Sequence, residues 1–153
     1  MTMKIDWIPE LMPDEWPNGV LEQMDPALFN NAVIPLRQMS GIAMTPSPLP
    51  EAHVRHEGES RHSTKRGTDT RLSDATDLFI NGSQAAEMWR CAQQVTDIGG
   101  FGMYFDTNPS VMIHIDTRPE RLLWIRVGGA YIYEHRDPAF FYTQLGRQLE
   151  KLR

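Results

Sequence analysis

The segment 111–118 alternates apolar and ionisable side chains in a way that suits a β-strand. Residues two apart in a strand share a face, so His114, Asp116 and Arg118 would project together from one side. Ile113 and Ile115 would then point into the core from the other side. Three ionisable groups on one strand face are costly to bury unless they pair or coordinate something. The pattern therefore indicates a polar site carried on a core strand.

Two further segments carry side chains of similar chemistry. His62 lies in a polar stretch, and Asp77 directly precedes an apolar run at 78–80. Two histidines and one aspartate are suitable zinc ligands and leave a fourth position for water, which is the arrangement of catalytic sites. Zinc would lower the pKa of that water and polarise a carbonyl oxygen, and a nearby carboxylate such as Asp116 would act as general base.

The composition restricts which metal sites and partners the chain can have. Its 153 residues suffice for one domain, and 41% hydrophobic with 23% charged residues exclude a disordered chain or a coiled coil. Cys91 is the single cysteine, which excludes an intramolecular disulfide and a cysteine-based zinc finger. The formal net charge of -5 argues against a nucleic-acid partner or an anionic membrane surface.

The elements that must position these side chains follow an α+β order. We expect an irregular lead-in over 1–24, packed on the body, and a single domain over 25–153. Apolar spacing predicts helices from residue 26 to about 36, over 83–97 and from 137 onward. Strands are predicted over 75–80, 102–105, 111–115, 122–127 and 130–133, the last two joined by a Gly-Gly turn at 128–129. The expected fold is a small antiparallel sheet flanked by helices.

Residues 51–74 form a long polar loop, and such loops in compact domains are usually functional or disordered. His53 and His56 in this loop are expected to be exposed. The N-terminus lacks an apolar run of signal-peptide length, and no stretch reaches the apolar length of a membrane span. We therefore expect synthesis in the cytoplasm and no membrane span, with export dependent on a partner.

The order of these motifs resembles the zinc D-alanyl-D-alanine peptidase family. The matching pieces are Ser-x-His at 60–62, Ala-x-Asp at 75–77 and His-x-Asp-x-Arg at 114–118. The glycine-rich stretch at 99–104 is similar to the family's lead into its last histidine strand, and Trp124 after Arg121 to its Arg-x-x-Trp ending. The family comprises carboxypeptidases and phage endolysins that cut peptidoglycan stem peptides, with hedgehog domains as structural relatives. The resemblance spans residues 26–125 and implies the same fold.

This resemblance implies that His62, Asp77 and His114 hold a Zn²⁺ ion. The family's usual spacing between its first histidine and its aspartate is shorter than the separation of His62 and Asp77, so an insertion such as 64–72 must bulge out. Asp69 has the usual spacing, but it lacks the preceding alanine and a following apolar strand. We prefer Asp77 and keep Asp69 as the alternative ligand.

The identity of the general base stays open between two aspartates. Some branches of the family place an acidic residue three positions before the last histidine, or a histidine two positions before it. Those positions are Val111 and Met112 here. The candidate base is then Asp116, or Asp106 on the preceding strand.

Arg55 and Arg118 are candidates for binding a substrate carboxylate through bidentate hydrogen bonds, because the family's Ser-Gly-Tyr-Arg segment is missing. The expected function is a zinc-dependent peptidase acting on peptidoglycan stem peptides, as a D-Ala-D-Ala carboxypeptidase or an endolysin-type endopeptidase. It would act at the cell wall after release or virion delivery, although its acidic charge differs from the basic face of many such enzymes. The alternative is a catalytically inactive phage structural, assembly or binding protein on the same fold.

Overall fold

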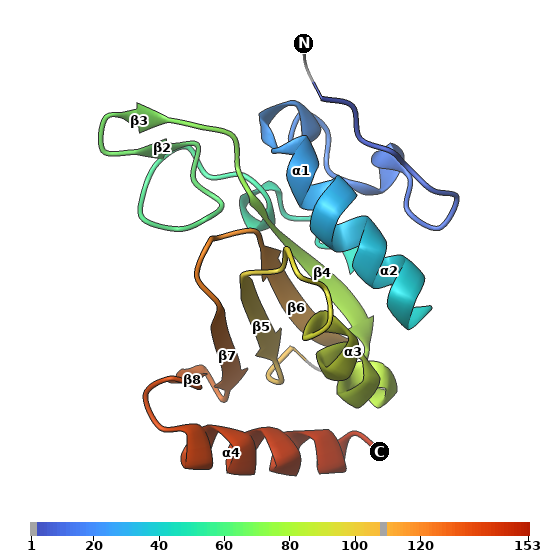
Figure 1. Cartoon of the computed structure of the whole chain (residues 1–153), viewed down its shortest axis with the longest axis vertical. Helices are drawn as coiled ribbons and strands as arrows, with labels where there is room; N and C mark the ends of the chain where they lie inside the picture. Colours follow the sequence, from blue (N-terminus) through green and yellow to red (C-terminus); the bar gives the residue numbers. More distant parts are fainter. Residues whose placement is uncertain (1–2, 108–109) are drawn as a thin grey trace.

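A six-stranded sheet forms the centre of the molecule in the computed structural model, which describes residues 3–107 and 110–153 (Figure 1). From edge to edge the strands are β1 (Thr45–Pro46), β4 (Ala75–Asn81), β6 (Ser110–Asp116), β5 (Gly100–Tyr104), β7 (Leu122–Val127) and β8 (Ala130–Tyr133). Strands β5 and β7 are parallel, and the other neighbours are antiparallel. The α+β class is therefore confirmed.

The parallel pair departs from the predicted antiparallel run. Strands β4 and β5 already occupy both edges of β6, so β7 cannot pair with the strand that precedes it in sequence. It joins the other edge of β5 and runs in the same direction as β5.

The strand register brings the polar residues into rows on one face of the sheet. One row runs from β4 to β8 and consists of Asp77, His114, Gly102, Trp124 and Tyr133. Residues paired across a sheet project to the same face, and the face alternates along each strand. The row and its neighbours two residues away therefore make one continuous polar surface.

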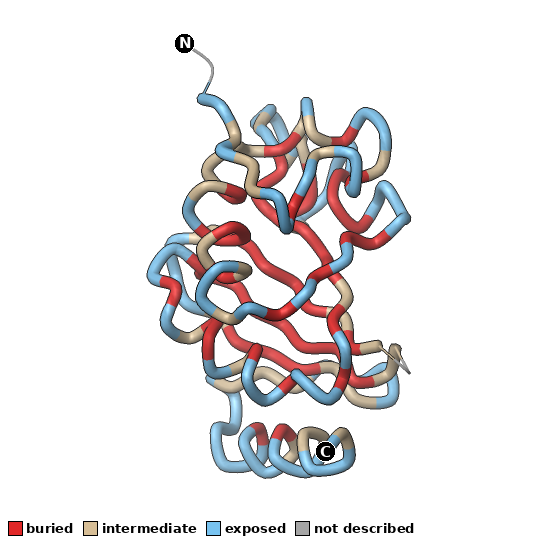
Figure 2. The backbone as a smooth tube through the Cα atoms, turned by 90° about the vertical axis from the view of Figure 1, so that its right-hand side faces the viewer, coloured by how far each residue is buried: buried red, intermediate tan, exposed pale blue. Residues whose placement is uncertain are grey.

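The opposite face of the sheet carries the hydrophobic core. The central strands are mostly buried, whereas exposed residues are concentrated in the surrounding loops and in α4 (Figure 2). Ile113 and Ile115 are fully buried, as their alternation with the ionisable residues predicted. Trp89 of α3 (Ala85–Ala92) packs against Phe101 of β5 and Phe141 of α4 (Pro138–Lys151), with ring centroids 5.5 and 5.7 Å away. Among the described residues, no helix has the length and apolar character needed to cross a membrane.

The first helical stretch begins after Asp25, whose side chain accepts a hydrogen bond from the backbone N–H of Ala27. It continues through α1 (Pro26–Leu28), a π-helical turn (Phe29–Val33) and α2 (Ile34–Ser40). It ends at Gly41, which has a φ of 67° and so takes the left-handed conformation favoured by glycine. This stretch packs against α3 and β6 on the core side of the sheet.

The chain before Asp25 packs on the body through apolar side chains. It contains the short 3-10 turns η1 (Pro13–Glu15) and η2 (Leu21–Gln23). Leu11 and Trp16 are buried in the same core as the helices, and Trp16 lies 5.2 Å from Phe29, measured between ring centroids. Residues 1 and 2 of the predicted lead-in lie outside the described residues.

The polar loop over 51–74 is more ordered than its composition suggests. It contains a 3-10 turn, η4 (Pro50–Ala52), and a hairpin of β2 (Lys65–Arg66) and β3 (Asp69–Thr70), with Gly67 at a φ of 59°. The hairpin projects from the body (Figure 1). The prediction that residues 64–72 bulge out is therefore confirmed.

His53 is fully buried, which corrects the expectation that it is exposed. Its Nε2 lies 2.8 Å from the carbonyl oxygen of Ser47 and its Nδ1 lies 2.7 Å from Thr76 Oγ1. Burial lowers the pKa of His53, which favours a neutral ring that donates from Nε2 and accepts at Nδ1. The residue thus anchors the start of the loop against β4, whereas His56 is exposed as predicted.

Candidate metal centre

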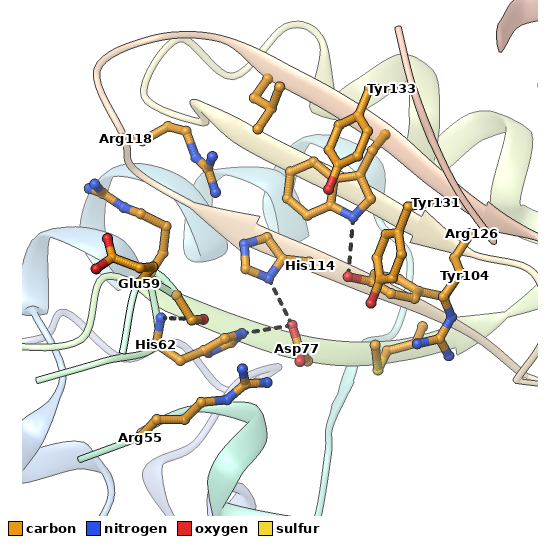
Figure 3. A pocket seen from close by; sticks show the side chains of 15 residues that line it. Arg55, Glu59, His62, Asp77, Tyr104, His114, Arg118, Arg126, Tyr131 and Tyr133 are labelled. Atoms are coloured by element: carbon orange, nitrogen blue, oxygen red, sulfur yellow. Dashed lines mark hydrogen bonds and ion pairs between the residues drawn. The ribbon is translucent and has the colours of Figure 1, made fainter. Parts of the chain in front are cut away.

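The three predicted metal ligands meet in a pocket on the polar face of the sheet (Figure 3). Asp77 Oδ1 lies 3.0 Å from His114 Nδ1 and 3.4 Å from His62 Nε2. His62, Asp77 and His114 are only 3%, 6% and 5% exposed. One ligand atom from each lies within 4.8 Å of the others. A buried group of this composition can hold a metal ion.

Two of the separations within this cluster are close to those of a tetrahedral ion. With metal–ligand bonds of about 2.1 Å, two ligand atoms of a tetrahedral zinc site lie about 3.4 Å apart. The separations from Asp77 Oδ1 are 3.4 Å to His62 Nε2 and 3.0 Å to His114 Nδ1. Two imidazole nitrogens and one carboxylate oxygen are also a donor set that zinc accepts, and three protein donors leave a fourth position.

The sheet and one loop position these ligands. Asp77 and His114 are directly paired between β4 and β6, so the strand register alone brings them together. His62 comes from the loop, where the backbone N–H of Arg55 donates to the carbonyl of His62 at 2.9 Å. The N–H of Thr64 in turn donates to the carbonyl of Arg55 at 2.8 Å. This short ladder holds His62 over the sheet.

Asp74 ties the same loop to the beginning of β4. It accepts hydrogen bonds from Nε and Nη2 of Arg61, the residue that precedes His62. Arg71 Nη2 donates to Asp74 from the other side at 2.8 Å. The backbone on both sides of the insertion is therefore fixed relative to the metal cluster.

Asp116 contacts the other nitrogen of His114, away from Asp77. Its Oδ2 lies 2.7 Å from His114 Nε2, while His114 Nδ1 faces Asp77. The fully buried carboxylate also accepts hydrogen bonds from the N–H of Gly100 at 2.9 Å and from Arg118 Nε at 2.8 Å. A carboxylate on the outer nitrogen of a metal-binding histidine fixes the tautomer and the ring orientation. Asp116 does not line the pocket, where a general base would be needed.

The two histidines of the cluster differ in the contacts of the ring nitrogen that faces away from Asp77. His62 Nδ1 is buried and has no hydrogen-bond partner among the described residues. His114 has a carboxylate at each ring nitrogen. The protein therefore fixes the orientation of His114 more firmly than that of His62.

Contacts within the cluster shift the pKa values of Asp77 and His114. Burial alone would raise the pKa of Asp77, but hydrogen bonds from His114 and His62 hold it well below its usual range. Burial lowers the pKa of His114, but hydrogen bonds to Asp116 and Asp77 outweigh this effect and raise it to about 9. Metal binding at Nδ1 of His114 must therefore displace a proton at neutral pH.

Glycines make room for the groups that flank His114. A Cβ on Gly100 would lie 2.2 Å from Asp116 Oδ2, and a Cβ on Gly102 would lie 2.3 Å from Trp124 Nε1. The Trp124 ring packs against His114, with centroids 4.9 Å apart. Any larger residue at either glycine would displace a group that supports His114.

The pocket above the cluster has a volume of about 370 Å³. Arg55 and Arg118, the predicted substrate-binding residues, both line it. Arg118 is held by Asp116 through Nε and Nη2. Arg55 forms no ion pair with any described residue, and its Nε donates to the carbonyl of Glu51 at 3.1 Å. The unpaired cation of the pocket is therefore Arg55.

The two alternative aspartates lie elsewhere. Asp69 is exposed on β3, and the metal-binding cluster contains Asp77 instead. Asp106 accepts hydrogen bonds from Arg126 Nε at 2.9 Å and from the N–H of Gly129 at 2.7 Å, and it does not line the pocket. The geometry favours Asp77 as the metal ligand. Asp106 instead links Arg126 to the turn at Gly129.

Several pocket residues were not indicated by the sequence motifs, among them Glu59, Tyr131 and Tyr133. Glu59 is exposed and forms no ion pair with a described residue, and an irregular loop gives no periodic signal that would reveal it. The two tyrosines are two apart in β8, so alternation alone would have placed them on one face.

No protein-family model, curated protein or solved structure significantly matches this chain. The candidate metal centre is therefore defined by its own geometry, which comprises a buried His-Asp-His cluster, a carboxylate behind one histidine and a pocket in front.

Proposed function

We propose that the protein is a zinc-dependent peptidase that cleaves peptidoglycan stem peptides, as a D-Ala-D-Ala carboxypeptidase or an endopeptidase. The observation that carries this proposal is the buried cluster of His62, Asp77 and His114 beside a pocket of about 370 Å³. The spacing of its donors supports zinc, and the motif order that resembles the D-alanyl-D-alanine peptidases supports the substrate class.

Zinc held by this cluster would lower the pKa of a water molecule and polarise the carbonyl oxygen of the scissile bond. Asp116 would act as a positioning residue that keeps His114 in the tautomer with an unprotonated Nδ1. Arg118 and the N–H of Gly100 would in turn hold Asp116 ionised and in place. This role differs from the general base predicted for Asp116, because its carboxylate is buried behind the histidine.

We assign the general base to Glu59. Asp116 and Asp106 do not line the pocket and each is paired with an arginine, whereas Glu59 lines the pocket and has no ion pair with a described residue. A carboxylate at the pocket can act as general base by accepting the proton of an attacking water. Glu59 lies three residues before His62 on the same loop.

Arg55 would bind the carboxylate of the substrate. It lines the same pocket as the metal cluster and offers an unpaired guanidinium, which can form two parallel hydrogen bonds to a carboxylate. Arg118 also lines the pocket, but Asp116 already occupies two of its nitrogens. Arg55 therefore contributes the greater share of substrate binding.

One observation favours the alternative, a protein that keeps zinc without hydrolysing a peptide. Val111 is buried at the position where some branches of the family have an acidic residue. If no other carboxylate accepts the proton, the metal site would serve binding or stability alone. The two proposed functions differ in whether Glu59 accepts a proton during peptide hydrolysis.

The test is hydrolysis of a purified stem peptide by the zinc-loaded protein, followed by product analysis. We expect cleavage by the wild type and none by His114→Ala. Glu59→Gln should retain its zinc and lose about 10²- to 10⁴-fold in kcat, the usual contribution of a general base.

Glu57→Gln is the matched control, because Glu57 is exposed on the same loop but does not line the pocket, and its kcat should be unchanged. A zinc-loaded wild type that cleaves no stem peptide would contradict the proposed function. Equal activity of Glu59→Gln and Glu57→Gln would contradict the assignment of the base.

A further inference from the structure

The polar row of the sheet continues past the metal centre to the edge strand. From His114 it passes to Trp124 on β7 and then to Tyr133 on β8. The next row pairs Arg126 with Tyr131. Both tyrosines line the pocket beside His114 (Figure 3). The pocket therefore extends from the metal cluster to an aromatic surface at the sheet edge.

This aromatic surface, which we call the tyrosine platform, consists of Tyr104, Tyr131 and Tyr133. The rings of Tyr131 and Tyr133 are within 18° of parallel, with centroids 6.4 Å apart. Tyr104 meets Tyr131 edge to face at 6.1 Å. Tyr131 is 50% exposed and so is accessible to a ligand, whereas Tyr104 is buried and supports Tyr131 from beneath the surface. Tyrosine combines a rigid apolar face with a polar hydroxyl and suits ligands that have both characters.

Arg126 holds the tyrosine platform in shape. Its guanidinium lies 4.6 Å from the ring centroid of Tyr104 and 5.8 Å from that of Tyr131. Asp106 fixes Arg126 through Nε at 2.9 Å and is itself held by the N–H of Gly129. A surface that is already ordered loses little conformational entropy when a ligand binds.

Most of the arginines near the tyrosine platform are paired with carboxylates, in the pairs Arg126–Asp106, Arg118–Asp116 and Arg61–Asp74. Arg136 lies 4.9 Å from the ring centroid of Tyr133 and forms no ion pair with a described residue. Single-stranded nucleic acid would need a series of unpaired cations along the aromatic rings, and the net charge of -5 opposes it. An uncharged ring with hydroxyl groups and a flat C–H face matches both the rings and the hydroxyls of the platform.

We propose that the tyrosine platform is a saccharide subsite that binds a pyranose ring of the glycan to which the substrate peptide is attached. This inference rests on the proposed function. The ring centroid of Trp124 lies 4.9 Å from that of His114 and 6.2 Å from that of Tyr133. An extended peptide spans about 3.3–3.6 Å per residue, so a few residues bridge the metal cluster and the platform. A sugar bound there would lay the adjoining peptide across the metal centre.

The test of the subsite is calorimetric titration of the zinc-loaded protein with the tetramer of N-acetylglucosamine. We expect wild-type binding, and a dissociation constant raised about tenfold or more in Tyr131→Ala and Tyr133→Ala. Tyr131→Phe should keep most of the affinity, because it retains the ring face. Tyr142→Ala is the matched control, since Tyr142 is 49% exposed on α4 and lies outside the pocket, and its affinity should equal that of the wild type.

Absence of saccharide binding by the wild type overturns the proposal, and so does equal binding by Tyr131→Ala and Tyr142→Ala. Binding of a single-stranded oligonucleotide at these tyrosines, without saccharide binding, overturns it as well.

A second measurement separates this inference from the proposed function. We compare kcat/KM for a free stem peptide with that for the same peptide linked to its disaccharide. The subsite predicts a preference of about tenfold for the linked peptide in the wild type, lost in Tyr131→Ala. Equal cleavage of both substrates by the wild type overturns the subsite and leaves the peptidase function in place. Saccharide binding without cleavage of either substrate supports the subsite and overturns the peptidase function.

Discussion

His114 has both ring nitrogens engaged by carboxylates, and this arrangement determines what the site can do. Nδ1 faces Asp77 at 3.0 Å, and Nε2 faces Asp116 at 2.7 Å. A metal that replaces the proton at Nδ1 finds the ring already oriented from behind. The alternation of the segment 111–118 predicted that His114, Asp116 and Arg118 share a face. It could not predict which nitrogen each carboxylate contacts, because that depends on side-chain rotamers.

The first prediction concerns Asp116 as a positioning residue. Asp116→Asn removes the charge behind His114 and should weaken zinc binding by about 10- to 100-fold, as for other carboxylates behind metal-bound histidines. Competition with a chromogenic chelator measures the affinity. Asp106→Asn is the control, because Asp106 holds Arg126 and not His114, and its zinc affinity should equal that of the wild type. Unchanged zinc affinity in Asp116→Asn, together with a large loss of kcat, would instead identify Asp116 as the base.

At the scale of elements, strand register assembles the site. Asp77, His114, Gly102 and Trp124 stand in one row across β4, β6, β5 and β7. These four strands were predicted close to their observed bounds, because period-two alternation and glycine turns are local signals. The short strands β1, β2 and β3 were not predicted. The register between the strands is not local, so the sequence alone could not place Trp124 beside His114.

The glycine stretch at 99–104 is a second case in which the local sequence does not determine the structure. The sequence predicted that the helix over 83–97 runs up to this stretch, whereas α3 ends earlier, at Ala92. Gly100 and Gly102 lie within β5, where they admit Asp116 and Trp124 at close range. The requirement for glycine comes from side chains on neighbouring strands. It therefore cannot be predicted from the local sequence signals that mark a helix end.

The second prediction compares two glycine substitutions. Gly102→Ala places a Cβ 2.3 Å from the Trp124 ring, so the indole must move. We expect a loss of about 1–3 kcal/mol in the free energy of unfolding, measured with urea, and weaker zinc binding. Gly146→Ala is the control in α4, where a Cβ meets nothing within 4 Å, and it should raise stability by up to about 1 kcal/mol. Equal stability of the two variants would show that Trp124 does not need this close approach.

In the whole molecule, the hydrophobic core is spatially separate from the candidate site. The hydrophobic core lies on one face of the sheet, and the metal cluster, pocket and tyrosine platform lie on the other. The α+β class followed from the order of elements in the sequence. The burial of His53 did not, because it depends on packing against β4, whose Thr76 lies 23 residues further along the chain.

This separation predicts how the protein responds to loss of metal. Chelation should lower the midpoint of thermal unfolding without unfolding the chain at room temperature, because the core does not depend on the cluster. Zinc at a hundredfold excess over its dissociation constant would contribute about 2.7 kcal/mol. Circular dichroism with a chelator, and then with zinc restored, measures the shift. His114→Ala should show no shift, and complete unfolding of the wild type on chelation would contradict the prediction.

Zinc content per chain tests the central claim most directly, because the proposed peptidase chemistry requires the His62–Asp77–His114 cluster to hold the ion. After zinc loading and removal of excess metal, we expect one zinc per chain in the wild type and in Asp69→Ala, whose aspartate is exposed on the hairpin. Asp77→Ala, which keeps its fold by circular dichroism, should contain almost none. A wild type without zinc, or an Asp77→Ala protein that retains zinc while Asp69→Ala loses it, would contradict the claim.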